Sequence, residues 1–433
     1  MRGFLKMRSA IALVLVMTAG GIPAAFAQSP RSVWDGVYAE EQASRGVALY
    51  QQECASCHGK TMQGRGQSPP LAGDDFKSNW NGQPLGDLFD KMSTSMPADR
   101  PGKLNGGQNA DILAYMLQQN GFPAGSAPLS GSADALKPIR FDSAKPAALT
   151  EIAIHGDRPF PESVSSTSDG AIFAGGLASH MVFRAAPGAA TAEPWIGPGT
   201  NGLQDVLGVL ADERAGVLWV CSTNVSGQGE PTALKSFDLK TATPKGSFPF
   251  PGTKPVCNDI AIGPDGAVYV TDTGNPRILK LKPGGAALEV WASDDRFDSL
   301  DGIAFGDATT LYVNTVRSGH LFRIQVGRDG AAGHVTQLEL SAKLENPDGM
   351  RADGNGQLLL VEGAGRLDRV TFQGDTARIQ VLKDGYNGPT AVTRVGNTAW
   401  VLEGRLARMS DPAYKDRDPG PFKLYAVSLQ EKK

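Results

Sequence analysis

The sequence is poor in the residues that most often mark a site on their own. Its 433 residues include only four cysteines and five histidines, and the net charge is −3. So few cysteines exclude a disulfide scaffold. The balanced charge offers no basic stripe, so we expect no nucleic-acid partner. Apolar and charged contents, 41% and 20%, are normal for a globular chain, and its length favours two domains.

Long apolar runs are also missing after residue 27. The chain opens with "MRGFLKMRSAIALVLVMTAGGIPAAFA", which has basic residues, an apolar run and a small-residue ending at Ala27. This pattern predicts a signal peptide over residues 1–27, with cleavage before Gln28. No later run is long enough to span a bilayer. We expect a soluble, exported protein of the periplasm or a similar compartment. An uncleaved membrane anchor is the alternative.

Two of the four cysteines stand together in "ECASCHGKTMQGRG", at Cys54 and Cys57, with His58 adjacent. Two thiols one helical turn apart can form thioethers with the two vinyl groups of one haem, and the next imidazole then faces the iron. The alternatives are a thioredoxin-like redox pair, which would follow a strand in a βαβ unit, and a zinc site, which would need further ligands nearby. The motif predicts one covalent haem c.

Three methionines are candidates for the second axial ligand of the iron. Met62 lies too close to His58 in the chain to reach the opposite haem face. Met92 belongs to an amphipathic stretch, so we expect it in the core. Met96 follows that stretch in "STSMPADRPGKL", where two prolines favour an extended loop. We therefore expect Met96 to be the thioether ligand, which suits electron transfer.

These stretches resemble a class I c-type cytochrome. "RGVALYQQECASCHG" is similar to the first helix of that family and its haem motif, "TSMPADRPGKL" to its methionine loop, and "ADILAYMLQQNGFP" to its last helix. The resemblance implies an all-α cytochrome c domain over residues 28–123. It also implies that Gly46 and Tyr50 lie where the first and last helices cross, near Tyr115.

A different pattern begins after a segment rich in Ala, Pro, Ser and Gly, which predicts a linker over residues 124–147. A polar residue, a short apolar strand, a Gly-rich turn and a second strand then recur six times. Their starting points are Glu162, Asp205, Asn258, Asp301, Asp348 and Pro389. The period of 41 to 53 residues is typical of four-stranded propeller blades. It predicts an all-β domain over residues 148–433, a six-bladed β-propeller, with a β-sandwich as the alternative.

Two strands fall outside the six copies. They are "LTEIAIHG" and "KLYAVSL", and we expect them to pair in one blade and close the ring. Cys221 and Cys257 end one blade's second strand and start the next blade's first strand. They are either disulfide-bonded or buried free thiols, and the sequence leaves both open.

The residues that open the copies would line one end of the central channel. Glu162, Asp205, Asn258, Asp301 and Asp348 would place oxygen donors there, which suit Ca²⁺ or another divalent cation. The alternative is that the Asp and Asn residues simply form turns. His155, His180 and His320 are isolated in sequence, and we expect structural roles for them.

The repeats resemble the six-bladed SMP-30/gluconolactonase-like propellers and, more loosely, NHL-type ones. The segments that carry the resemblance are "PES", "CNDIAIGPDGAVYVTD", "LDGIAFGDATTLYVN" and "NPDGMRADGNGQLLLVE". It implies a divalent cation held by Glu162, Asp301 and Asp348, with Asn258 as a further contact and Asp348 as the catalytic candidate. The family's usual Arg is replaced by Val256 and its later Asn by Asp301, which weakens the case for a sugar-lactone substrate.

Three functions follow from these patterns. The first is a periplasmic single-haem electron carrier whose propeller binds a ligand, a metal or a redox partner, such as a dehydrogenase or a terminal electron acceptor. The second is a lactone hydrolase coupled to a dehydrogenase. The third is a quinone-cofactor sugar or alcohol dehydrogenase that reduces its own haem, although such a cofactor needs basic side chains that the channel-opening positions lack.

Overall fold

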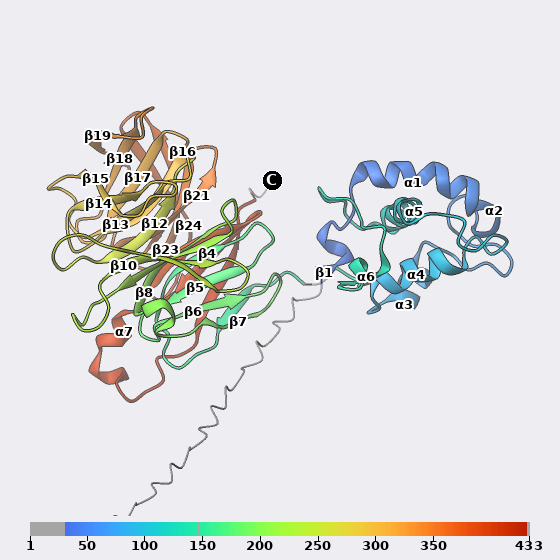
Figure 1. Ribbon diagram of the computed structural model, residues 1–433, viewed down its shortest axis with the longest axis horizontal. Helices are drawn as coiled ribbons and strands as arrows, with labels where there is room; N and C mark the ends of the chain where they lie inside the picture. The colour runs from blue at the N-terminus through green and yellow to red at the C-terminus, as the bar shows by residue number, and fades with distance from the viewer. Residues whose placement is uncertain (1–30, 146, 431–433) are drawn as a thin grey trace, which may run out of the picture.

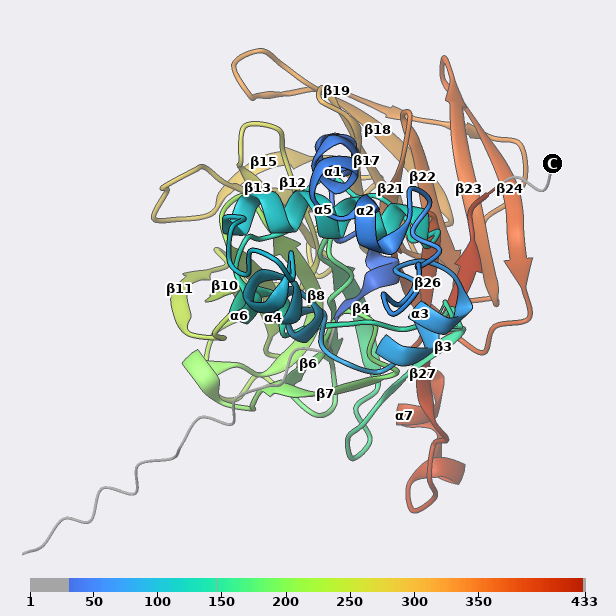
Figure 2. The ribbon, with the colours of Figure 1, turned by 90° about the vertical axis from the view of Figure 1, so that its right-hand side faces the viewer.

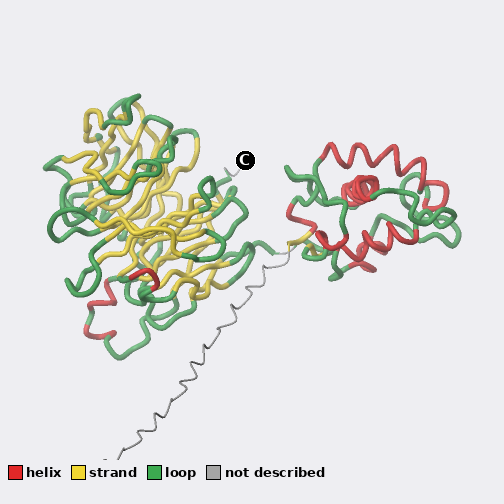
Figure 3. Tube along the Cα trace, viewed as in Figure 1, coloured by secondary structure: helices red, strands yellow, loops and turns green. Residues whose placement is uncertain are grey.

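The computed structural model describes residues 31–145 and 147–430. The predicted signal peptide lies outside the described residues. A helical part is followed by a part built almost entirely of strands (Figures 1 and 3). The helical part contains α1 (Glu40–Glu53), α2 (Ala55–His58), α3 (Asp74–Trp80), α4 (Leu85–Ser95), α5 (Gly106–Gln119) and α6 (Ala133–Leu136), with the short strands β1 (Arg31–Ser32) and β2 (Ile139–Arg140).

The helical part is organised around the crossing of α1 and α5. A Cβ atom at Gly46 would lie 2.0 Å from the carbonyl oxygen of Asp111, so only glycine allows this approach. The rings of Tyr50 and Tyr115 meet edge to face, 5.7 Å apart. The crossing expected at these residues is therefore confirmed. Asn105 caps α5 through a reciprocal pair of hydrogen bonds with Gln108, which fixes where the helix begins.

The predicted linker is wrong over most of its length. Leu129, Leu136 and Phe141 are buried in the same core as the helices, and β2 pairs in parallel with β1. Gln42 holds the segment further, because its side chain accepts from the N–H of Leu129 and donates to the carbonyl of the same residue. The segment shows no periodicity because it is a folded-back tail whose few apolar residues fill separate gaps in the core.

The β part begins with β3 (Glu151–Ile154), and most of its strands pair antiparallel with their neighbours in sequence. The first sheet contains β4 (Pro161–Ser166), β5 (Ile172–Gly176), β6 (Met181–Ala185) and β7 (Thr191–Ile196). The next two are β8 (Asp205–Asp212), β9 (Val217–Thr223), β10 (Ala233–Asp238), β11 (Pro244–Pro249), and β12 (Cys257–Ile262), β13 (Val268–Asp272), β14 (Arg277–Leu281), β15 (Glu289–Ser293).

The later strands repeat the same arrangement. They are β16 (Leu300–Asp307), β17 (Thr310–Thr315), β18 (His320–Val326) and β19 (Ala332–Gln337), then β21 (Pro347–Gly354), β22 (Gln357–Glu362), β23 (Arg366–Gln373) and β24 (Thr376–Asp384) with β20 (Glu339–Leu340) on its edge. The last group is β25 (Pro389–Val395), β26 (Thr398–Glu403), β27 (Phe422–Ser428) and β3 (Glu151–Ile154), with α7 (Ala407–Ser410) between β26 and β27.

The two ends of the β part are joined as expected. Strand β27 pairs antiparallel with β3, with Phe422 opposite Ile154. Strand β3 also pairs in parallel with β7, with Ala153 opposite Thr191. The first and last groups therefore merge into one eight-stranded sheet, and β3 is hydrogen-bonded on both sides.

The first strands of the groups form the inner wall of the β part. Strands β4, β8, β12, β16, β21 and β25 each contact the next, and β25 contacts β4, so the contacts close on themselves. Figure 2 shows the groups following one another around this wall. The arrangement is consistent with a propeller and excludes two facing sheets. Within the described residues, no helix is long and apolar enough to cross a membrane.

Candidate functional sites

The haem motif lies at the junction of two helices. Cys54 ends α1 and precedes α2, whose last residue is His58. The His58 ring is buried, and its Nδ1 lies 2.8 Å from the carbonyl oxygen of Pro69. A carbonyl can only accept, so Nδ1 carries the proton and Nε2 keeps the lone pair that binds a metal. Tyr50 fixes the turn after His58, because its hydroxyl donates to the Gly59 carbonyl at 2.8 Å.

The two thiols of the motif are unpaired. Burial, followed by the nearby Glu53 and Cys57, raises the pKa of Cys54 to about 11. A thioredoxin-like pair needs a thiol whose pKa is lowered. The partly buried thiol, the exposed one and the oriented imidazole therefore fit covalent attachment of haem better than dithiol redox chemistry.

The three methionines occupy different environments. Met62 is fully buried, with its carbonyl accepting from the N–H of Leu71, and it belongs to the core. Met92 is partly buried against the same core. Met96 ends α4 and begins the loop that leads to α5, with its side chain half-buried. Met92 packs against the core as expected, and Met62, set aside for its closeness to His58, is part of the core. Met96 remains the axial-ligand candidate.

A second group of chemistry-bearing side chains gathers where the inner strands begin. Each inner strand contains a β-bulge near its start: for example, Pro161 pairs with Gly176 but Ser163 with Gly175. The bulge follows the first pair in five strands and the second pair in β8. A bulge adds an unpaired residue and turns its side chain away from the regular alternation. The residues that directly follow the last pair before the bulge are Glu162, Leu207, Asn258, Asp301, Asp348 and Thr390.

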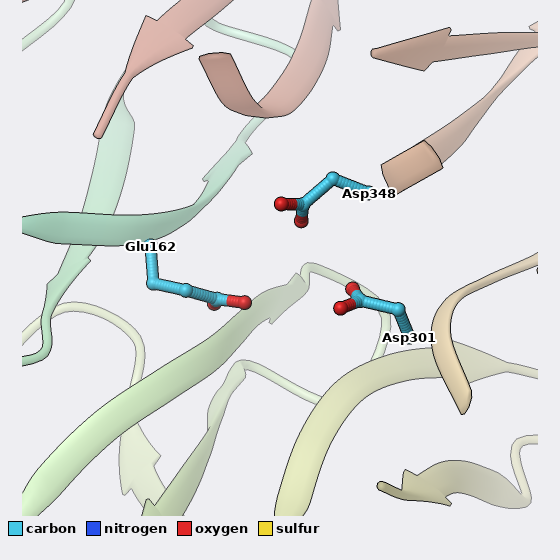
Figure 4. Close-up of side chains that lie close together, drawn as sticks. All are labelled: Glu162, Asp301 and Asp348. Atoms are coloured by element: carbon cyan, nitrogen blue, oxygen red, sulfur yellow. The ribbon is translucent and has the colours of Figure 1, made fainter. Parts of the chain in front are cut away.

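Three carboxylates converge among these six residues. Glu162, Asp301 and Asp348 each place an oxygen within 4.8 Å of the other two. Figure 4 shows the three side chains pointing toward one another from separate strands. Glu162 and Asp301 are buried, and Asp348 is partly exposed. We call this group the acid cluster.

In the acid cluster, burial and mutual repulsion disfavour the ionised form of each carboxyl. Burial is the main cause of the raised pKa of all three carboxyls, followed by repulsion from neighbouring carboxylates. For Asp301 the pKa rises to about 7. A divalent cation would remove this repulsion, and hard oxygen donors are the ligands that Ca²⁺ and Mg²⁺ prefer.

Asn258 adds an amide to the acid cluster. Its Nδ2 donates to Asp301 Oδ2 at 3.2 Å and to Thr273 Oγ1 at 2.9 Å. Its Oδ1 is buried without a hydrogen-bond partner. A buried, unpaired carbonyl oxygen is costly unless something accepts its lone pairs, so this atom fits a fourth cation ligand.

Two of the six equivalences drawn from the sequence are wrong. Asp205 lies two residues before Leu207, the residue that the bulge places at the channel. Its carboxylate pairs instead with His180 Nε2, at 3.3 Å, and accepts from the N–H of Val225. Thr390, not Pro389, holds the position in β25. The turn pattern used to align the repeats does not show at which residue each bulge lies.

An ion pair that the sequence did not reveal lies beside the acid cluster. The Arg351 guanidinium on β21 donates to both oxygens of Asp259 on β12, at 2.8 and 3.1 Å. It also reaches the carbonyl oxygens of Val164 on β4 and Val209 on β8, at 3.4 and 3.5 Å. One side chain therefore links four inner strands. The only signal in the sequence is a basic residue in the middle of an inner strand.

The histidines lie outside the acid cluster. His155 pairs with Glu193 at 2.8 Å, and His180 with Asp205. His320 packs edge to face against Phe322. The structural roles expected for them are consistent with these contacts.

Cys221 and Cys257 form a disulfide, with their Cα atoms 5.1 Å apart. The bond joins β9 to the first residue of β12, next to Asn258. It resolves the choice between a disulfide and free thiols, and it braces the strand that carries the amide of the site.

Comparison with known protein families gives a match in the helical part. Residues 41–116 match the family described as "Cytochrome C oxidase, cbb3-type, subunit III". No curated protein matches the chain.

Several solved structures resemble the β part. A gluconolactonase from Xanthomonas campestris is 17% identical, with 64% of this chain and 89% of that chain covered and a TM-score of 0.48. A PQQ-bound aldose sugar dehydrogenase from Streptomyces coelicolor is 16% identical, with coverage of 66% and 100% and a TM-score of 0.46. A virginiamycin B lyase from Staphylococcus aureus is 16% identical, with coverage of 62% and 80% and a TM-score of 0.45.

Proposed function

We propose that the protein, whose helical part contains a cytochrome c domain, is an exported single-haem electron carrier. Its β part would be a six-bladed propeller with a cation-binding site at its channel. The observation that carries the proposal is the haem motif itself: two unpaired thiols beside a buried imidazole whose Nδ1 is fixed by the Pro69 carbonyl. The six groups of four strands, with their closed ring of inner-strand contacts, support the propeller.

Haem c, when bound, supplies one-electron transfer at the iron. The chain's contribution is attachment and tuning. Cys54 and Cys57 would form the thioethers, and His58 would bind through Nε2 in the orientation that Pro69 imposes. Met96 would be the second axial ligand, and its thioether would raise the reduction potential. The partner would be a redox protein, such as a dehydrogenase or a terminal acceptor.

Export is a proposal that rests on residues 1–27 and on the disulfide. Structural disulfides persist in oxidising compartments, and covalent haem in this motif fits the same setting. We therefore place the mature chain, beginning at Gln28, in the periplasm or an equivalent exported compartment.

The cation site would consist of Glu162, Asp301, Asp348 and the Oδ1 of Asn258. Its support is the convergence of three buried or partly buried carboxyls and the unpaired amide oxygen. Waters would complete the coordination, because Ca²⁺ takes six to eight oxygens.

Lactone hydrolysis is the second candidate function, and the exposure of Asp348 favours it. Asp348 is the partly exposed member of the acid cluster, and burial beside Asp301 and Glu162 raises its pKa, which makes it a stronger base than a free carboxylate. A bound cation would polarise the substrate carbonyl.

The quinone dehydrogenase is less well supported. The arginine found beside the acid cluster, Arg351, already pairs with Asp259 and does not offer its charge to a cofactor carboxylate.

The test is to purify the exported protein, record its visible spectrum, and titrate it with Ca²⁺ by calorimetry. We expect a c-type haem spectrum and one Ca²⁺ site, lost in Asp301→Asn. Lactones and sugars are then screened for hydrolysis and for reduction of the haem. A spectrum without haem would refute the carrier. Lactone turnover that is unchanged in Asp348→Ala and Glu162→Ala would refute the hydrolase site, and sugar-dependent haem reduction would favour the dehydrogenase.

A further inference from the structure

The second strand of each group ends opposite the residue that starts the inner strand. In three groups the residue at this end is a buried carboxylate: Asp272 on β13, Glu362 on β22 and Glu403 on β26. Each accepts a backbone N–H from the loop that enters the inner strand. We call these three residues the clamp carboxylates.

The contacts of the clamp carboxylates repeat closely. Asp272 Oδ1 accepts from the N–H of Val256 at 2.9 Å. Glu362 Oε2 accepts from the N–H of Glu345, and Glu403 Oε1 accepts from the N–H of Asn387 at 2.8 Å.

Each clamp carboxylate is also held by an arginine from its own hairpin. Arg277 Nε donates to Asp272 Oδ2 at 2.9 Å, Arg366 donates to Glu362 Oε2 at 3.0 Å, and Arg405 donates to Glu403 Oε2 at 2.8 Å. The arginines therefore give each clamp carboxylate charge-assisted hydrogen bonds and a fixed orientation.

The clamp carboxylates hold the loops that lead directly into the inner strands. The N–H that Asp272 holds belongs to Val256, two residues before Asn258, and a backbone bond from Thr273 to the Val256 carbonyl closes the same turn. The N–H that Glu362 holds belongs to Glu345, three residues before Asp348. Glu403 holds the entrance to β25, which brings Thr390 and no carboxylate to the channel.

We propose that Asp272 and Glu362 are positioning residues for the cation site: they fix the entrances of β12 and β21, so that Asn258 and Asp348 face one cation. The inference rests on the proposed cation site. Coordination demands oxygen positions within a few tenths of an ångström, and an entrance loop held at only one side would not supply that accuracy. Glu403 holds the loop that enters β25 in the same way, but β25 carries no proposed cation ligand.

This arrangement provides an internal control. Asp272→Asn, Glu362→Gln and Glu403→Gln each change one oxygen to an NH₂ group with almost no change in size. In Asp272→Asn and Glu403→Gln the single amide oxygen cannot accept from both the loop N–H and the arginine. In Glu362→Gln the NH₂ group replaces the oxygen that pairs with Arg366 Nε. Each variant therefore weakens its clamp and lowers stability. Only the first two variants touch strands that carry proposed ligands.

The experiment measures Ca²⁺ affinity by calorimetry and the free energy of unfolding by denaturant, on the intact haem-containing protein. We expect Kd for Ca²⁺ to rise about tenfold in Asp272→Asn and Glu362→Gln, as for other outer partners of metal ligands. We expect it to change less than about twofold in Glu403→Gln. Ser222→Ala is a second control, because Ser222 holds the N–H of Gln204 at the entrance to β8, whose channel residue is Leu207.

Two results would overturn the assignment. Equal weakening in all four variants would make the clamps general stabilisers, and unchanged affinity in Asp272→Asn and Glu362→Gln would remove their role in positioning. If Glu362→Gln does not fold, Asp272→Asn decides the question alone. A wild-type protein that binds no Ca²⁺ would refute the cation site itself and the clamps' role with it, an outcome distinct from the other two.

Discussion

In the helical part, the residues proposed to attach the haem occupy five consecutive positions, from Cys54 to His58. In the β part, the acid cluster is drawn from three strands that start near residues 162, 301 and 348, and a bulge in each strand turns the side chain into place. The first site needs one local helix junction. The second exists only when the whole ring is closed, so damage far from it in sequence should still reach it.

The largest effect is expected from the local site. Replacing Cys54 and Cys57 together by serine removes both thioether bonds, so the purified chain should carry no covalent haem. Haem staining after denaturing electrophoresis measures this directly. The matched control is Cys221→Ser with Cys257→Ser, which removes the other two cysteines and should retain the haem. Covalent haem in the first variant would contradict the assignment.

The assembled site should be most sensitive at its ion pair. Arg351→Met leaves the buried carboxylate of Asp259 without its partner, which should lower the free energy of unfolding of the β part by about 3–5 kcal/mol. Denaturant unfolding followed by tryptophan fluorescence checks this.

Two controls test whether the loss of stability in Arg351→Met comes from the uncompensated buried charge. The double variant Arg351→Met with Asp259→Asn removes the uncompensated charge and should recover much of the loss. Arg45→Met breaks a pair with Asp111 in which the arginine is largely exposed, and it should lower stability far less, because solvent screens an exposed ion pair. If Arg351→Met and Arg45→Met lowered the free energy of unfolding equally, the Arg351–Asp259 pair would contribute no more to stability than an exposed ion pair.

Removing the disulfide should have a somewhat smaller effect. Cys221→Ser with Cys257→Ser frees a loop of 36 residues and should cost roughly 2–4 kcal/mol. Since the bond braces β12 beside Asn258, Ca²⁺ affinity should fall as well, while the haem spectrum stays unchanged. A shift in the haem spectrum would show that the two parts are coupled and would contradict a haem site that depends on the helical part alone.

The helix crossing offers a test in the other part. Gly46→Ala forces a methyl group against the Asp111 carbonyl, and it should cost about 1–3 kcal/mol. In Gly107→Ala the added atom meets only Asn105 Oδ1, at 3.4 Å, so this variant in the same domain should be neutral or slightly stabilising. Thermal unfolding followed through the haem band compares the two. Equal melting temperatures would refute the tight crossing.

The smallest effect is a pH dependence at the acid cluster. Its carboxyls have raised pKa values in the folded state, with Asp301 at about 7, so the ionised forms destabilise the cation-free fold. This destabilisation begins above the unfolded pKa of a carboxyl, near pH 4, and is complete above the folded pKa. Bound Ca²⁺ would offset it.

The measurement is the melting temperature at pH 5, 6, 7 and 8, with Ca²⁺ and with a chelator. The difference between the two should be small at pH 5 and should widen through pH 7. Asp368, whose pKa is raised to about 8 by burial and by Glu362, lowers stability over the same range. Because it does so with or without Ca²⁺, the comparison removes its contribution. A difference that is largest at pH 5 would contradict the cation site.

The contrast between the two parts also explains what the sequence could predict. Cys54, Cys57 and His58 are recognisable because their spacing alone defines the chemistry, and the role of Gly46 is implied by the resemblance to class I c-type cytochromes. The period of the β repeats predicted the grouping of strands and the pairing of β27 with β3. The tail over residues 124–142 was missed because its buried residues follow no period.

The remaining errors arise where the fold brings distant residues together. Glu162, Asp301 and Asp348 were chosen correctly as a converging group, but Asp205 was included because a turn pattern does not reveal where the bulge lies. Arg351 was missed because its partner, Asp259, is on another repeat. The clamp carboxylates were missed because each acts on a loop that precedes it by 16 or 17 residues.

The central claim, a mature chain that begins at Gln28 and carries one covalent haem on Cys54 and Cys57, is tested most directly by intact-mass spectrometry of the exported protein. The account predicts the mass of residues 28–433 with the Cys221–Cys257 disulfide plus one haem. The mass of the polypeptide alone, or of a chain with a second disulfide, would contradict it.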